Sequence, residues 1–145
     1  MNITDRCPKD YVGVLLLTEG KDLIVQHRDN KKGIAWPDSL GVFGGNVEGT
    51  EMLGEAVQRE LKEELDIEID QNKLIPFKTY YQTLEKYGQT VTCHIFILND
   101  INPEGITVYE GQGYKILTRK TSIPDIKASP IMKEIMIDYF DFLSK

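Results

Sequence analysis

The chain contains few of the residues that build disulfide frameworks or zinc sites. It has two cysteines, Cys7 and Cys93, and neither stands in a CxxC pair or another metal-like spacing. We interpret Cys7 as a free thiol near the N-terminus and Cys93 as a strand residue. The two histidines, His27 and His94, lie in strand-like segments with no partner at ligand spacing, so we predict structural roles for both.

Long hydrophobic runs and an excess of positive charge are also missing. No apolar run approaches the roughly 18 residues that a membrane span needs, and no charged-then-apolar leader opens the chain. We therefore expect a cytoplasmic protein with no membrane segment. The formal net charge of −6 argues against broad binding to nucleic acids, because such binding needs a basic face.

The remaining composition fits one compact domain over residues 1–145. A chain of 145 residues has the usual size of a single domain, and 41% hydrophobic residues can supply a core. No repeat, low-complexity tract or linker divides the sequence.

The hydrophobic pattern predicts several strands interleaved with two helices, which indicates a mixed sheet packed between helices, an α/β architecture. We expect strands at 11–18, 22–28, 41–43, 77–85 and 91–98. The first two strands form one hairpin and the last two form another, which turns at 86–90. The short strand at 41–43 precedes a glycine turn. Residues 106–119 read as strand, loop and strand. A closing helix is predicted from Ser129 to Leu143, with Ser129 as N-cap and Pro130 in its first turn.

The most informative segment is a second helix, predicted to begin near Glu51. At about 100° per residue, an apolar stripe recurs every four positions, at Leu53, Val57, Leu61 and Leu65. Glu60 and Glu64 lie within about 40° of this stripe rather than on the wet face, and Glu63 lies beside Ala56. Three carboxylates therefore flank or interrupt the buried face.

Burying unpaired carboxylates is costly, so a positive partner is needed. Arg59 can pair with Glu55 or Glu63 four positions away, but one guanidinium cannot neutralise the cluster. Glu60 and Glu64 are roughly 6 Å apart along the axis, close enough to share Mg²⁺ or Mn²⁺. The alternative is an ordinary charged helix whose acids are solvated or paired with Lys62 and Arg59.

The order and spacing of this segment resemble the signature motif of the Nudix hydrolases. The matching residues are Gly45, Glu51, Arg59-Glu60-Leu61, Glu63-Glu64 and Ile67. Asp66 departs from the pattern, because the family has glycine there, at the usual left-handed end of the helix. Phe43 stands where many members carry proline.

The resemblance implies an α/β/α sandwich and hydrolysis of a nucleoside diphosphate linked to another group X. It implies metal binding by Glu60 and Glu64, assisted by Glu63, and by the main-chain carbonyl of Gly45. Arg59 would orient these carboxylates, and Glu51 would support the helix and loop. An ordinary helix ion pair is the alternative for both.

The resemblance also suggests a general base outside the motif. Glu110 matches an acidic residue that many members place after a late strand to bind metal or activate water. A solvated loop glutamate is the alternative, and Glu48 is a second candidate by proximity.

We therefore predict a Mg²⁺-dependent diphosphohydrolase of a small nucleotide, with Mn²⁺ as the other candidate cation. A nucleoside triphosphate, including an oxidised one, is favoured over ADP-ribose or a nucleotide sugar because of the short chain. A nucleotide-sensing or protein-binding domain without turnover is the alternative of another class, and retention of all three glutamates ranks it lower. Many relatives are dimers, which leaves a homodimer open. The aromatic residues that could stack on a base are Trp36, Tyr80, Tyr81 and Tyr87, although core packing or surface exposure is the more common fate of each.

Overall fold

The strands of the chain form one mixed sheet. The computed structural model describes residues 10–84 and 88–145, so the predictions for Cys7 and Tyr87 lie outside the described residues, as do residues 86–87 of the predicted turn at 86–90. Strand β1 (Asp10–Leu17) lies at the centre, parallel to β6 (Gln89–Leu98), and the other pairings are antiparallel. The strand order is β3-β2-β1-β6-β5, and two further strands pair outside this order, β4 with β1 and β7 with β2.

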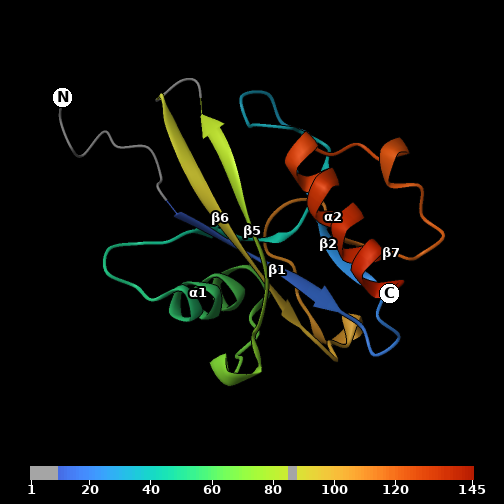
Figure 1. Cartoon of the computed structure of the whole chain (residues 1–145), viewed down its shortest axis with the longest axis horizontal. Helices are drawn as coiled ribbons and strands as arrows, with labels where there is room; N and C mark the ends of the chain where they lie inside the picture. Colours follow the sequence, from blue (N-terminus) through green and yellow to red (C-terminus); the bar gives the residue numbers. More distant parts are fainter. Residues whose placement is uncertain (1–9, 85–87) are drawn as a thin grey trace.

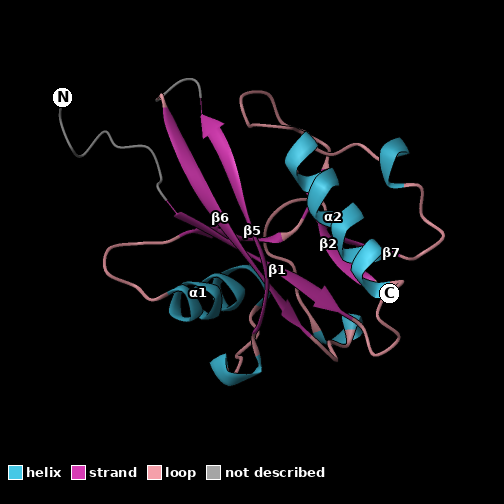
Figure 2. Cartoon of the chain, in the orientation of Figure 1, coloured by secondary structure: helices cyan, strands magenta, loops and turns pink. Residues whose placement is uncertain are grey.

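The remaining elements surround this centre. Their bounds are β2 Leu23–His27, β3 Leu40–Gly41, β4 Phe43–Asn46, α1 Leu53–Leu65, β5 Ile75–Leu84, β7 Tyr114–Leu117 and α2 Pro130–Leu143, with short 3-10 turns at Gln71–Lys73, Pro103–Gly105 and Ile123–Asp125. Figures 1 and 2 show α1 and α2 on opposite sides of the strands.

Each face of the sheet carries its own apolar core. Leu15, Leu23 and Val25 pack toward Ile135 and Tyr139 of α2. The alternate residues of the same strands form the other core, in which Val12, Val14, Leu16 and Ile24 pack against Val57, Leu61 and Leu65 of α1. This period-two division between two helices confirms the predicted α/β class with a mixed sheet.

The two halves of the sheet separate where the site lies. Strands β1 and β2 pair only at Leu16–Ile24 and Leu17–Leu23. Farther along, β1 pairs with β4, whereas β2 pairs with β3 at Gln26–Gly41 and His27–Leu40. The opening between these two pairs of strands leaves room beside the end of α1.

Several element boundaries differ from the sequence prediction. The expected strand at 41–43 is divided into β3 and β4, and Gly44 and Gly45 are strand residues that pair with Gly13 and Val12 rather than a turn. Helix α1 begins at Leu53, two residues later than predicted. The closing helix begins and ends as predicted, and the Met132 backbone N–H donates to Ser129 Oγ at 3.4 Å.

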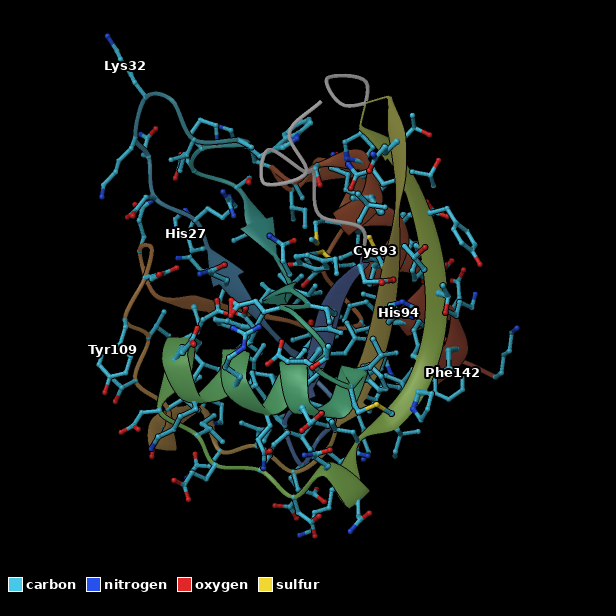
Figure 3. The ribbon with its side chains drawn as sticks, turned by 90° about the vertical axis from the view of Figure 1, so that its left-hand side faces the viewer. His27, Lys32, Cys93, His94, Tyr109 and Phe142 are labelled. Atoms are coloured by element: carbon cyan, nitrogen blue, oxygen red, sulfur yellow. The ribbon has the colours of Figure 1, made fainter. Side chains whose placement is uncertain are left out.

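Residues 106–109 do not form the predicted strand. The Thr107 N–H donates to the Leu65 carbonyl and the Tyr109 N–H donates to the Glu64 carbonyl, at 3.5 and 3.1 Å. Because the last carbonyls of a helix have no partner within the helix, this segment binds them instead of a neighbouring strand. It is thereby held against the C-terminal end of α1, beside which Tyr109 lies in Figure 3.

Asp66 ends α1 in the left-handed conformation that the family pattern assigns to glycine, with φ of 55° and ψ of 38°. Its Oδ1 forms a 2.8 Å ion pair with Lys62 on an exposed surface. Such surface pairs contribute little, whereas the left-handed conformation costs a non-glycine residue about 1 kcal/mol.

We expect Asp66→Gly to raise the free energy of unfolding by about 0.5 kcal/mol, because relief of the left-handed strain exceeds the loss of the exposed ion pair. Urea denaturation measures the effect. Asp66→Asn serves as the matched control, because it removes the charge while keeping a side chain that tolerates this conformation. A less stable Asp66→Gly protein would show that the ion pair with Lys62 governs this helix end.

Candidate active site

The carboxylates of α1 fall into two groups. Glu64 is 8% exposed and the Glu60 side chain is 14% exposed, so the helical wheel placed both correctly beside the buried face. The Glu63 side chain is 59% exposed, and its Oε2 lies 3.4 Å from Arg59 Nη1. Glu63 is thus more solvated than its predicted position beside Ala56 implied.

Glu64 carries a buried oxygen with no partner. Within the described residues, Glu64 Oε1 accepts no hydrogen bond although it is shielded from solvent. Burial raises the pKa of Glu64 to about 8, and the neighbouring carboxylates of Glu60 and then Glu110 contribute to the same rise. Burial also raises the pKa of Glu60, with Arg59 acting against it. Two adjacent acids that both resist ionisation indicate a place where positive charge is needed.

Arg59 organises the acidic residues around this pair. Its Nε and Nη2 bind the two oxygens of Glu51 at 2.7 and 3.0 Å, and its Nη1 binds Glu60 Oε1 at 2.9 Å. Its Nη2 also donates to the Asn46 carbonyl at 2.9 Å. Arg59 holds the pKa of Glu51 below its ordinary value. The guanidinium therefore joins α1 to the end of β4 and fixes one side of Glu60.

Glu51 ties the loop before α1 to the same network. Its Oε1 accepts the Glu48 backbone N–H at 2.8 Å, in addition to the fork from Arg59. Glu55, the other predicted partner of Arg59, instead accepts the Met52 N–H at the start of the helix. Glu48 reaches Arg59 only at 3.6 Å from an exposed position.

The two strand glycines bring β4 close to both β1 and α1. A Cβ on Gly44, whose φ is 156°, would overlap the Val12 carbonyl oxygen, so only glycine fits there. A Cβ on Gly45 would overlap the Glu60 carboxylate. The main chain of Gly45 is therefore in direct reach of the acidic pair.

We expect Gly45→Ala to lower activity more than stability. The added methyl group meets the end of a flexible side chain, which can move away at small cost, but the movement takes Glu60 out of place. The predicted result is a fall in kcat of about tenfold or more with a small change in Tm. Gly105→Ala is the control, because its Cβ would meet no atom within 4 Å. Equal loss of activity and stability would contradict this account of Gly45.

The side chains of this site offer oxygen donors, which are the ligands that a hard divalent cation prefers. Among residues 10–84 and 88–145, no group of three His, Cys, Asp or Glu side chains is arranged to hold a metal ion. The pair Glu60 and Glu64 nevertheless offers carboxylate oxygens, one of them without a partner, and Mg²⁺ prefers oxygen ligands of this kind. The predicted ligand roles of Gly45, Glu60, Glu63 and Glu64 stay predictions.

Glu110 is brought to this pair from a distant part of the sequence. The hydrogen bond from Tyr109 to the Glu64 carbonyl holds the loop there, and the charge of Glu110 acts on the pKa of Glu64. Glu110 is exposed at the mouth of the pocket. The structure thus brings together the predicted acidic residues, while the role of Glu110 as a base stays a prediction.

A pocket of about 390 Å³ extends from Glu64 into the opening of the sheet. Glu64, Glu110 and Gly44 lie at one end, and the apolar side chains of Val42, Ile95 and Ile135 lie toward α2. This volume is typical of small-molecule sites.

Of the stacking candidates within the described residues, only Trp36 lines this pocket; it is 50% exposed at the rim. Tyr80 is buried elsewhere, with its hydroxyl donating to Asp138 Oδ2 at 2.8 Å, and Tyr81 is exposed outside the pocket. Of the two alternatives, core packing therefore holds for Tyr80, whose ring belongs to the core beneath α2.

The two histidines lie away from the acidic pair. His27 Nε2 contacts Asp38 Oδ1 at 2.8 Å, and His94 Nε2 contacts Asp10 Oδ1 at 3.0 Å. Figure 3 shows them on opposite sides of the molecule, and neither lines the pocket.

Tyr11, Gln26 and Arg28 are among the pocket residues that the sequence analysis did not single out. Gln26 and Arg28 belong to a run that was read only as a strand. The available signal was a glutamine that directly follows three apolar strand residues, Leu23, Ile24 and Val25.

The comparisons with known proteins decide the family. The NUDIX domain matches residues 8–123 of the chain. The chain belongs to the Nudix family. The predictions of a Nudix hydrolase, of its α/β fold and of an enzyme of this class are thereby confirmed. Nudix hydrolases generally use a divalent metal and act on small nucleotide substrates.

Solved structures show the same fold at low sequence identity. A MutT/nudix family protein from Enterococcus faecalis is 19% identical, with a TM-score of 0.70, and the match covers 96% of this chain but only 63% of that protein. The dihydroneopterin triphosphate pyrophosphohydrolase of E. coli is 19% identical, with a TM-score of 0.71 and coverage of 94% and 99%.

A third similar structure is a bifunctional NMN adenylyltransferase/ADP ribose pyrophosphatase from Francisella tularensis, complexed with AMP and a manganese ion. It is 17% identical, with a TM-score of 0.70, and the match covers 94% of this chain and 42% of that protein. No curated protein matches the sequence. In the described part of this Nudix chain, no helix is long and apolar enough to cross a membrane.

Proposed function

We propose that this Nudix protein is a Mg²⁺-dependent hydrolase of a diphosphate linkage in a small nucleotide, with a nucleoside triphosphate as the favoured substrate class. The observation that carries the proposal is the buried, unpartnered Oε1 of Glu64 beside Glu60, at the acidic end of a pocket. A domain that only binds protein has no use for such a costly arrangement.

Glu60 and Glu64 would hold the cation, with the Gly45 carbonyl and assistance from Glu63. When bound, Mg²⁺ would neutralise the phosphate oxygens and lower the pKa of a water molecule. Arg59 and Glu51 are positioning residues in this scheme, because they hold Glu60 and join α1 to β4 without lining the pocket.

Glu110 is the group best placed to accept a proton from an attacking water. It lies at the mouth of the pocket, near enough to Glu64 for its charge to raise the pKa of that carboxyl. The apolar walls toward α2 would bind a ring and keep water from the far end of the pocket. The catalysis supplied by the chain is then mainly positional and electrostatic.

The deciding experiment measures phosphate and pyrophosphate release from a nucleotide panel with and without Mg²⁺, with Mn²⁺ in parallel. The panel contains ordinary and oxidised nucleoside triphosphates, ADP-ribose and a nucleotide sugar. We expect metal-dependent turnover, fastest for a triphosphate. Preference for ADP-ribose or a nucleotide sugar would transfer the assignment to those substrates. Tight binding without turnover across the panel would instead establish a nucleotide sensor.

The cellular setting forms part of the same proposal. We expect a cytoplasmic protein that acts on free nucleotides, and light scattering of the purified protein will show whether it is the homodimer that many relatives form.

A further inference from the structure

Strand β2 and the residue after it present two polar side chains to the pocket that the proposed chemistry does not use. Gln26 and Arg28 are separated by one residue, so they project from the same side of the strand, and both line the pocket that contains Glu64 and Glu110. Both belong to the β2 side of the opening in the sheet, whereas Glu60 and Glu64 are on α1.

Gln26 is unusual for a strand residue. It is 9% exposed, and within the described residues its carboxamide makes no hydrogen bond. Its amide atoms keep some contact with solvent, because among the described residues only Glu64 Oε1 is a buried side-chain oxygen or nitrogen without a partner. The two buried serines that line the pocket each have a partner, Ser39 Oγ donating to the Trp36 carbonyl and Ser129 Oγ accepting from Met132. The Gln26 amide is therefore available for a ligand.

Arg28 supplies the charge beside it. Its Nε donates to the Ala35 carbonyl at 3.1 Å, and in the part of the chain that the structure describes its guanidinium has no carboxylate within ion-pair distance. It is also the sole cationic side chain among the described residues that line the pocket. Its positive charge and its remaining N–H groups suit phosphate oxygens.

Tyr11 lines the same pocket as Arg28, Glu64 and Glu110. Burial raises the pKa of the Tyr11 phenol, the carboxylates of Glu64 and Glu60 add to the rise, and Arg28 acts in the opposite direction. The guanidinium and the acidic pair therefore both act on one side chain of this pocket.

We infer that Gln26 and Arg28 form a second anion site at β2, which binds a phosphate group of the substrate that the cation does not hold. This inference rests on the proposed function. A substrate with only two phosphates, such as ADP-ribose, has both of them at the cation and leaves this site without a ligand. A nucleoside triphosphate supplies a third phosphate that the site can bind. The pair therefore selects substrates with an additional terminal phosphate.

The first test uses inorganic triphosphate in EDTA, so that binding does not depend on a cation. Trp36 is the single tryptophan of the chain and lies at the pocket rim, so its fluorescence reports binding. We expect Arg28→Gln and Gln26→Leu to weaken binding at least tenfold and about threefold, respectively, and Arg28→Lys to stay within about threefold of the wild type. Arg119→Gln, which removes an exposed arginine outside the pocket, should bind normally.

The lysine variant separates charge from structure. Arg28→Lys would lose the Nε contact with Ala35 but keep the charge, so equal loss in Arg28→Lys and Arg28→Gln would assign Arg28 to holding the loop and overturn the anion site. Absence of wild-type binding to inorganic triphosphate would overturn it as well. Both results are obtained without turnover, and so remain distinct from failure of the proposed function.

The second test measures selectivity. In Arg28→Gln, kcat/KM should fall at least tenfold for a nucleoside triphosphate, mainly through KM, and less than about threefold for ADP-ribose. An equal fall for both substrates would show that the pair does not read the additional phosphate, and would overturn the inference.

Discussion

Glu64→Gln should lower kcat by at least a factor of roughly 100 while leaving the fold intact, because it replaces a proposed metal ligand. Stability should change in the other direction. Glu64 is a buried carboxyl whose Oε1 has no partner within the described residues, and burial raises its pKa to about 8. At neutral pH the folded state must keep a proton that the unfolded state releases, and a neutral amide of the same size removes this cost. We expect the variant to be as stable as the wild type, or more stable, when both are measured in EDTA.

This combination distinguishes a catalytic ligand from a structural residue. Steady-state kinetics and urea denaturation provide the two measurements. Glu68→Gln is the matched control, because the Glu68 side chain is 83% exposed on the same stretch of chain and forms a 3.4 Å ion pair with Lys62; it should leave kcat unchanged. Near-normal activity in Glu64→Gln would end the ligand assignment, and loss of both folding and activity would assign Glu64 to the core.

Arg59→Gln should produce the largest loss of stability among the site variants. The substitution leaves Glu51 and Glu60, both mostly buried, without their cation, and it removes the contact with Asn46. Fully buried pairs cost about 3–5 kcal/mol when one partner is removed. Because these side chains keep some contact with water, we expect about 2 kcal/mol in urea denaturation, together with a lower kcat as Glu60 loses its position.

A double-mutant cycle isolates the contact with Glu51. Glu51→Gln and Arg59→Gln should show a coupling of about 1–2 kcal/mol, because the fork holds both Glu51 oxygens. Arg59→Lys should recover little of the stability, since lysine cannot form the fork. A coupling below about 0.3 kcal/mol would show that the network contributes only surface charge.

The sequence predicted those parts of the site that lie on one helix. The angular spacing of Glu60 and Glu64 was sufficient, because a helix has a fixed geometry and its apolar stripe marks the buried side. The same wheel could not show that Glu63 turns toward Arg59 and solvent, because the packing of β4 decides which flank of the helix is covered. The left-handed end at Asp66 followed from the family pattern, which places glycine there, together with the tolerance of aspartate for this conformation.

The rest of the pocket depends on how distant segments meet. Whether Gln26 faces a core or a cavity is decided by the separation of β1 from β2, and that separation results from the pairing of β4 with β1 and of β3 with β2. The predicted strand at 106–109 failed for a similar reason, since its N–H groups bind the end of α1. Strand propensity contains no information about either contact.

The central claim, that Glu60 and Glu64 hold a divalent cation, is tested most directly by Mn²⁺ titration followed through the electron paramagnetic resonance signal of the free ion. Binding of Mn²⁺ to the wild-type protein should remove the free-ion signal. Glu64→Gln should raise the Kd for Mn²⁺ at least tenfold, and Glu68→Gln should leave it at the wild-type value. Equal Mn²⁺ binding by the wild type and Glu64→Gln would contradict the account.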